Sequence, residues 1–279
     1  MTPFPRTMVG GVSLSRMIIG TNWFLGYTHT SKAKDEFIRS YQSRKNIADI
    51  LCVFMERGVD TIMGPPHPLL PEAISDAQDR TGLRAILVLT PHFNVRPDQP
   101  PEGEPGRVFD ACRKMGAAFC MPHQCITDAL LDLRYGVLRD MDQFSRMIRE
   151  RGMVPGLSTH APEAIVIADK TNADVETYIA LYNSSGFLMH VEVDWMMRII
   201  KEARKPVMTI KPLAAGRILP PVGLAFVWNT IRDQDMVTIG TTTPDEAREV
   251  IDLSLDFLNR RLPDNELQTT RSKKILIKT

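Results

Sequence analysis

Three histidines stand at the ends of short apolar runs in the middle of the chain. His92 follows "AILVLTP", His123 follows "AAFCMP" and His160 follows "MVPGLST". An imidazole titrates near neutral pH and also binds divalent metals, so histidines gathered at one place indicate proton transfer or metal coordination. A structural hydrogen bond explains any one of them equally well. Three that follow successive apolar runs favour a site.

Two other ionisable residues border similar runs, Asp60 in "GVDTIMG" and Lys211 in "VMTIKPL". Burial lowers the pKa of a lysine, which then acts as a base or forms a Schiff base with a carbonyl; an anion-binding lysine is the competing interpretation. We predict a catalytic set in which His123 orients or polarises a substrate oxygen and Asp60 and His92 transfer protons. Lys211 holds an anionic or carbonyl group in this set.

The elements that must position these residues recur along the chain. An amphipathic segment ends in glycine and an apolar run follows, as in "NIADILCVFMERG" before "VDTIMG" and "RVFDACRKMG" before "AAFCMPH". The glycine fits a left-handed helix cap, and runs without alternation are typical of buried parallel strands. Counting eight such strands, we predict one α/β domain over residues 1–279, a (β/α)8 TIM barrel, with a lead-in at 1–15 and a tail at 265–279.

An open doubly wound sheet is the alternative fold, but no G-x-G-x-x-G follows an early strand. In a barrel, the carboxyl ends of the strands meet at one mouth, where function resides. The predicted mouth therefore gathers the four catalytic candidates with further polar residues, namely Asn22, Trp23, Thr90, Ser158, Thr159, His160, Asn183 and Thr241 to Thr243.

Composition favours a small-molecule partner. The 279 residues are 43% hydrophobic and carry a net charge of +1, with Lys and Arg scattered along the chain. Such a balance gives no reason to expect nucleic acid or membrane partners. We expect a cytoplasmic protein with four reduced cysteines, because a secretory segment and a disulfide framework are both missing from the pattern. A homo-oligomer is compatible with this composition.

Ordered motifs over nearly the whole chain resemble the aldo/keto reductase superfamily. "LSRMIIGTNWF" looks like the family's first strand, "GVDTIMG" like its F-D-T-A strand and "AAFCMPHQCITD" like the strand that ends in the active-site histidine. "GLSTHAPEAI", "YNSSG", "TIKPLAAGRI" and "VTIGTTTPDEAREVI" resemble later segments in the same order.

The resemblance implies a barrel that reduces carbonyl compounds, polyols or sugars with NADP(H). Asp60 and His123 match the family's aspartate and histidine, whereas its tyrosine acid and its lysine have no counterpart after Asp60 or in "LTPHF". Tyr27 or His29 in the long first loop are possible substitutes. The implied cofactor contacts, with "GTTTPDEA" as a phosphate-binding helix start, are Ser158, Asn183, Leu213, Gly216, Arg217, Gly240, Thr241 and Thr242.

Two alternatives stay open. His92, His123 and His160, with His67 or Asp60, suit zinc, manganese or iron in a metal-dependent lyase, isomerase or hydrolase. A barrel that has lost its catalytic residues can also serve as a non-catalytic binding protein.

Overall fold

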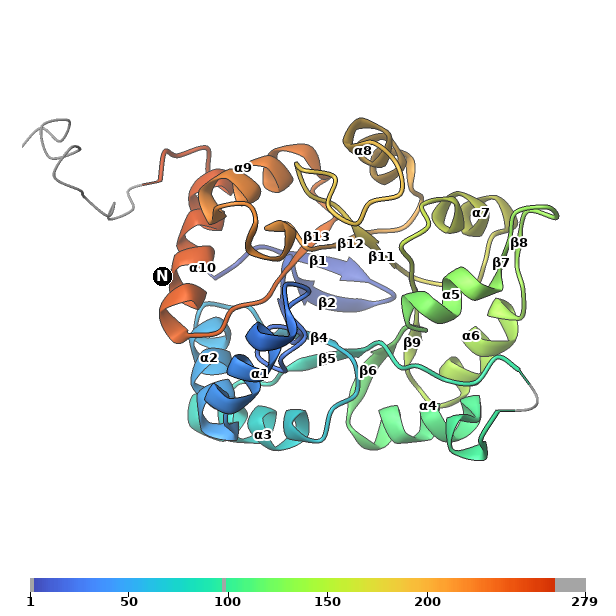
Figure 1. The fold of residues 1–279 in the computed structure, drawn as a ribbon, viewed down its shortest axis with the longest axis horizontal. Helices are drawn as coiled ribbons and strands as arrows, with labels where there is room; N and C mark the ends of the chain where they lie inside the picture. The colour runs from blue at the N-terminus through green and yellow to red at the C-terminus, as the bar shows by residue number, and fades with distance from the viewer. Residues whose placement is uncertain (1–2, 97–98, 264–279) are drawn as a thin grey trace, which may run out of the picture.

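Parallel strands form a closed ring at the centre of the molecule (Figure 1). The computed structural model describes residues 3–96 and 99–263, so the predicted tail 265–279 lies outside the described residues. Nine strand segments form the sheet, and β9 and β10 are two halves of one strand separated by Gly156, which makes an eight-stranded barrel. The segments are β3 (Met17–Gly20), β4 (Thr61–Gly64), β5 (Ile86–Leu89), β6 (Ala117–Cys120), β9 (Val154–Pro155), β10 (Leu157–Ser158), β11 (Tyr178–Leu181), β12 (Val207–Ile210) and β13 (Met236–Ile239).

Helices surround the ring on the outside (Figure 1). They are α1 (Lys32–Tyr41), α2 (Arg44–Glu56), α3 (Leu69–Thr81), α4 (Pro105–Lys114), α5 (Gln124–Leu130), α6 (Met141–Glu150), α7 (Glu163–Thr171), α8 (Val193–Glu202), α9 (Pro220–Thr230) and α10 (Pro244–Leu258). Strands and helices alternate as the sequence predicts, and the (β/α)8 barrel is confirmed.

Glycine ends the predicted amphipathic segments for the reason expected. After α3, Gly82 has φ +68° and its N–H donates to the carbonyl of Gln78; after α4, Gly116 has φ +84°. Only glycine adopts this conformation without a steric cost, so the chain can leave the helix and enter the next strand within a few residues.

The predicted lead-in forms a hairpin that closes the amino end of the barrel. It comprises β1 (Arg6–Val9) and β2 (Val12–Ser15), which pair antiparallel and lie inside the ring in the view of Figure 1. Val9 and Leu14 are fully buried in a cluster with Ile18, Phe119 and Met208 of the strands. A ligand therefore reaches the interior from the opposite end.

Additional elements lie at that opposite end. The chain between β3 and α1 folds over the barrel opening, where it is drawn in blue in Figure 1. Side chains of α1 hold it in place: Arg39 donates to the carbonyl of Gly26 at 3.1 Å, and the Asp35 carboxylate accepts the backbone N–H of Thr28 at 2.8 Å. A second hairpin, β7 (Leu131–Asp132) with β8 (Val137–Leu138), extends after α5.

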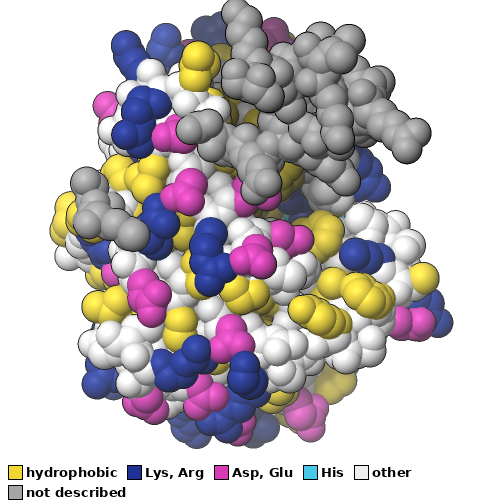
Figure 2. Space-filling model, turned by 90° about the vertical axis from the view of Figure 1, so that its left-hand side faces the viewer, with side chains coloured by type: hydrophobic (Ala, Val, Ile, Leu, Met, Phe, Trp, Pro, Cys, Tyr) yellow, Lys and Arg dark blue, Asp and Glu magenta, His cyan; other side chains and the backbone are white. Residues whose placement is uncertain are grey.

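The outer surface carries both positive and negative side chains. Figure 2 shows basic and acidic side chains interspersed where the described residues are visible on that face. Many of them pair between helices, as Arg44 does with Asp76 at 2.6 Å. Among the described residues, no helix is long and apolar enough to cross a membrane.

Candidate functional site

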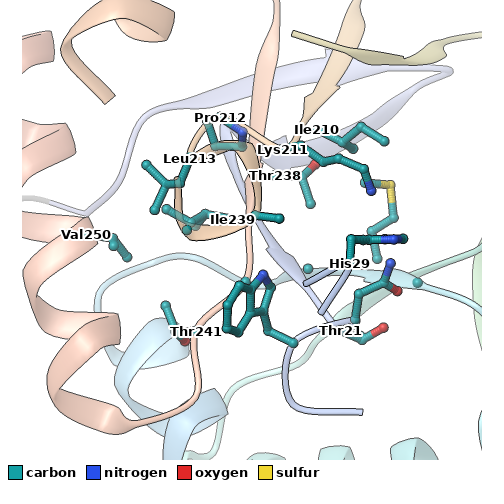
Figure 3. Close-up of a pocket in the computed structure, with 18 of the residues that line it drawn as sticks. Thr21, His29, Ile210, Lys211, Pro212, Leu213, Thr238, Ile239, Thr241 and Val250 are labelled. Carbon is teal, nitrogen blue, oxygen red and sulfur yellow. The ribbon is translucent and has the colours of Figure 1, made fainter. Parts of the chain in front are cut away.

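A pocket of about 330 Å³ opens at the carboxyl ends of the strands. The loops after β3, β12 and β13 line it, and the first turns of α10 close its far end (Figure 3). Its volume is in the range of small-molecule sites, and its position is the one at which TIM barrels bind ligands. The pocket is the candidate functional site.

Lys211 reaches into this pocket from the residue after β12. Its backbone has φ +60°, a left-handed conformation that costs a side-chain-bearing residue free energy and that persists at functional sites. Burial lowers the pKa of its ammonium group from 10.5 to about 8. Among the described residues no carboxylate lies within ion-pair distance of it, so its N–H donors remain free for a ligand.

The charge of Lys211 acts on three histidines. Figure 3 shows the ends of the Lys211 and His29 side chains on the same side of the pocket, and burial followed by the charge of Lys211 lowers the pKa of His29. Burial also lowers the pKa of His123, with further contributions from His92 and Lys211. The pKa of His160 is lowered from 6.5 to about 4, mainly by burial and further by the charges of Lys211 and neighbouring histidines. The imidazoles are therefore neutral at pH 7.

His123 has a defined tautomer. It is the N-cap of α5, where its Nδ1 accepts the backbone N–H of Cys125 at 3.4 Å and lies 3.0 Å from the Cys125 thiol. An imidazole nitrogen that accepts carries no proton, so the proton of neutral His123 is on Nε2. His123 thus offers a single N–H donor on the side of the ring away from α5.

The loop after β3 supplies an aromatic wall. Trp23 lines the pocket beside Gly216 and Gly240, and a Cβ atom at residue 240 would lie 2.8 Å from Cδ1 of Trp23. Tyr27 and His29 of the same loop also line the pocket. Both residues, considered from the sequence as substitutes for the missing tyrosine acid, thus lie at the mouth.

Hydroxyl groups without partners line the same space. Thr21, Thr238 and Thr241 are more than nine-tenths buried, and none of their Oγ1 atoms has a hydrogen-bond partner among the described residues. A buried hydroxyl without a partner costs free energy, typically about 1–3 kcal/mol. A ligand that carries polar groups would remove this cost.

Asp60 is not in the pocket, and the prediction that places it at the mouth is wrong. It precedes β4, and its carboxylate accepts a 2.8 Å ion pair from Arg6 of the β1–β2 hairpin at the closed end of the barrel. Parallel strands all run the same way, so residues before and after a strand lie at opposite ends of the ring. Met63 and Gly64 are the β4 residues that line the pocket.

The other predicted catalytic and metal residues are only partly brought together. His92 is exposed after β5, and Thr90 of that strand end lines the pocket instead. His123 and His160 are partly buried, and neither is among the residues that line this pocket. Among the described residues no group of three or more His, Cys, Asp or Glu side chains is close enough to hold a metal ion. His92, His123 and His160 therefore do not form the predicted ligand set.

The predicted cofactor contacts divide into two groups. Those that line the pocket are Ser158, Leu213, Gly216, Gly240 and Thr241. Those with other contacts are Asn183, whose side chain bonds to Phe187 and Ser185, Arg217, which stacks over the Phe187 ring at 4.2 Å, and Thr242, which bonds to Glu246.

Two kinds of lining residue were not predicted from the sequence. Thr238 lies two residues before Gly240, and the alternation of side chains along β13 was the signal that could have indicated it. Glu246 and Glu249 are one turn apart on α10, a spacing that places both on one helix face.

Comparison with known proteins supports the fold. The chain is similar to the PA4992 protein, a candidate aldo-keto reductase from Pseudomonas aeruginosa, with a TM-score of 0.63 and 14% identity over 91% of this chain and 96% of that one. It is also similar to an aldo/keto reductase from Brucella melitensis (TM-score 0.59, 12% identity, 93% and 98% covered). A third similar structure is the MGS-M4 aldo-keto reductase from a Medee basin deep-sea metagenome library, with a TM-score of 0.56 and 11% identity over 95% of this chain and 97% of that one.

The chain therefore has the barrel fold of the aldo-keto reductases, and the resemblance seen in its sequence is confirmed at the level of the fold. No protein-family model matches the chain, and no curated protein matches its sequence. Because one barrel fold supports many reactions, the function has to be argued from the site.

Proposed function

We propose that this protein is an oxidoreductase-like barrel enzyme that acts on a small carbonyl compound or the corresponding alcohol. One observation carries the proposal: the Lys211 amine, unpaired among the described residues, projects into a pocket that His29 also lines, and its charge lowers the pKa values of His29, His123 and His160. A carbonyl oxygen has lone pairs but no proton, so it is suited to a site that offers N–H donors without carboxylates at the same end. The substrate classes that fit are small aldehydes, ketones and sugars.

Lys211 and His123 have complementary tasks in this proposal. The Lys211 ammonium donates a hydrogen bond to the carbonyl oxygen and stabilises the negative charge that grows there. With a pKa of about 8, it is also able to deliver a proton at neutral pH. The N–H of neutral His123 orients the same oxygen. The pair replaces the tyrosine acid that the sequence lacks.

The pocket as a whole fits a hydroxyl-rich nucleotide. The partnerless hydroxyls of Thr21, Thr238 and Thr241 match polar ligand groups, and Gly216 and Gly240 permit a close approach to the backbone once the Trp23 ring moves. When bound, a nicotinamide dinucleotide supplies or accepts the hydride. The residues of this chain bind it and exclude water from the carbonyl.

Replacing Lys211 tests the proposal. We expect Lys211→Met to lower kcat/KM for carbonyl reduction about 10²- to 10³-fold, as the loss of an oxyanion donor does. The assay follows NADH or NADPH absorbance with glycolaldehyde, glyceraldehyde and pyruvate. Lys205→Met is the matched control, because Lys205 is a partly exposed lysine outside the pocket, 4.0 Å from Glu176. The proposal is contradicted if Lys211→Met keeps wild-type activity. It is also contradicted if the wild type turns over none of these carbonyl compounds.

Imine formation by Lys211 is a second candidate function, favoured by the absence of a described carboxylate beside its amine. Unprotonated Nζ would attack the carbonyl carbon, and loss of one water molecule would leave a C=N bond. Glycolaldehyde with cyanoborohydride distinguishes the two candidates. A mass gain on the Lys211 peptide of the wild type, without nicotinamide-dependent turnover, assigns imine chemistry instead of reduction.

A further inference from the structure

Charge is distributed unevenly along the pocket. Its titratable lining residues are Tyr27, His29 and Lys211 on the loops after β3 and β12, and Glu246 and Glu249 on α10. One end therefore offers N–H donors and positive charge, whereas the other offers carboxylate oxygens. A ligand that spans the pocket has to match both ends.

At the α10 end, the carboxylate of Glu246 places a negative charge beside the start of the helix. Oε2 of Glu246 accepts the backbone N–H of Thr242 at 2.6 Å and the Thr242 hydroxyl at 2.8 Å, while Thr243 Oγ1 accepts the N–H of Glu246 at 3.1 Å. These bonds form a reciprocal cap that uses helix-terminal N–H groups and opposes the positive end of the helix dipole. The sequence expectation that "GTTTPDEA" suits phosphate does not agree with this geometry.

Among the described residues of α10, no Lys or Arg side chain lines the pocket beside the two carboxylates. Arg248 of the same helix pairs with Asp245 and does not line the pocket. Glu249 has no hydrogen bond or ion pair among the described residues, so its oxygens are free to accept. The buried hydroxyl of Thr241, without a partner, lines the same part of the pocket.

We propose that the α10 end of the pocket is a subsite for a group with free hydroxyls, and that it selects NAD(H) over NADP(H). This inference rests on the proposed function. The nicotinamide ring has to lie beside the carbonyl at Lys211, so the adenosine ribose extends toward α10. A vicinal diol donates hydrogen bonds to Glu249, whereas a 2′-phosphate is repelled by Glu246 and Glu249 together.

Equilibrium titration of the full chain tests the subsite without relying on turnover. Binding of NADH and NADPH is followed by quenching of tryptophan emission, because Trp23 lines the pocket. We expect NADH to bind at least tenfold more tightly than NADPH in the wild type. Glu249→Lys is expected to weaken that preference at least tenfold or reverse it, and Glu249→Gln to change it in the same direction by less.

Glu202→Lys is the control, since it makes the same change of net charge at an exposed position of α8. It should leave the preference unchanged. Tighter NADPH binding by the wild type, an unaltered preference in Glu249→Lys, or no binding of either nucleotide overturns the subsite. If carbonyl turnover still depends on Lys211 in that case, only the subsite inference fails. If turnover is absent as well, the proposed function fails too.

Discussion

At the scale of single residues, the site depends on one amine and several imidazoles whose charged forms are disfavoured by burial. Besides burial, the charge of Lys211 lowers the pKa values of His29, His123 and His160. Burial is the largest cause of each shift, and it favours the uncharged form of a base. The resulting neutral imidazoles and the weakly acidic ammonium group suit proton transfer near neutral pH.

The same burial makes the fold sensitive to acid through His160. In the unfolded chain His160 titrates near 6.5, and in the folded protein near 4, so the unfolded state binds the proton first as pH falls. The free energy of unfolding therefore decreases between pH 6.5 and 4, by roughly 1–3 kcal/mol for a half-buried group. Denaturant midpoints at pH 7 and 4.5 measure this decrease.

His160→Asn should flatten that pH dependence, because the variant has no imidazole to protonate. The backbone N–H of residue 160, which donates to Asp128, is kept. His92→Asn is the control at an exposed position and should leave the pH dependence as it is. Equal pH slopes for the wild type and His160→Asn would show that this histidine does not carry the effect.

At the scale of elements, the strand ends and the loops after them set the shape of the pocket. β4 ends in Gly64, and a Cβ atom there would lie 1.7 Å from Oγ1 of Thr21 after β3. Since these two strands pair directly, any side chain at residue 64 would force the loop after β3 to move. The small residue is thus required for this loop to reach the mouth.

Gly64→Ala is expected to destabilise the protein by about 1–3 kcal/mol, the usual cost of overpacking a dense core. Gly64 does not have a positive φ, so backbone strain adds nothing to this value. Removing the threonine hydroxyl and methyl groups in Gly64→Ala/Thr21→Ala should restore part of the loss. Urea denaturation measures both variants, and a double variant no more stable than the single one would contradict the steric explanation.

At the scale of the whole molecule, the two ends of the barrel have different tasks. The β1–β2 hairpin fills the amino end with apolar side chains, and the loops at the other end carry the ionisable groups. This division is typical of TIM barrels, in which one face stabilises and the other binds ligands. It also determines which charged residues can take part in chemistry.

Asp60→Asn should therefore leave carbonyl kinetics unchanged. Its ion pair with Arg6 is partly exposed, with 36% and 21% of the two side chains accessible, so its loss costs roughly 0–1 kcal/mol of stability. Steady-state kinetics beside a thermal unfolding curve measure the two effects separately. A tenfold fall in kcat/KM with an unchanged unfolding curve would return Asp60 to the catalytic set.

The sequence by itself determined the barrel and most of its mouth. Apolar runs after helix-ending glycines report local conformation and burial, and both properties are written in neighbouring residues. The same logic identified Lys211, His123 and the possible reach of Tyr27 and His29, because each follows a strand or belongs to the first long loop.

Only the tertiary structure decided which end of β4 Asp60 occupies, because a shift of a few residues moves a side chain from one end of a strand to the other. It also showed that Arg217 stacks over Phe187 of the loop after β11, that Asn183 bonds to Phe187 within that loop, and that Glu246 and Glu249 line the pocket. Charges far apart in sequence meet only when the ring closes. Their combined effect on a ligand therefore depends on distances that no local pattern encodes.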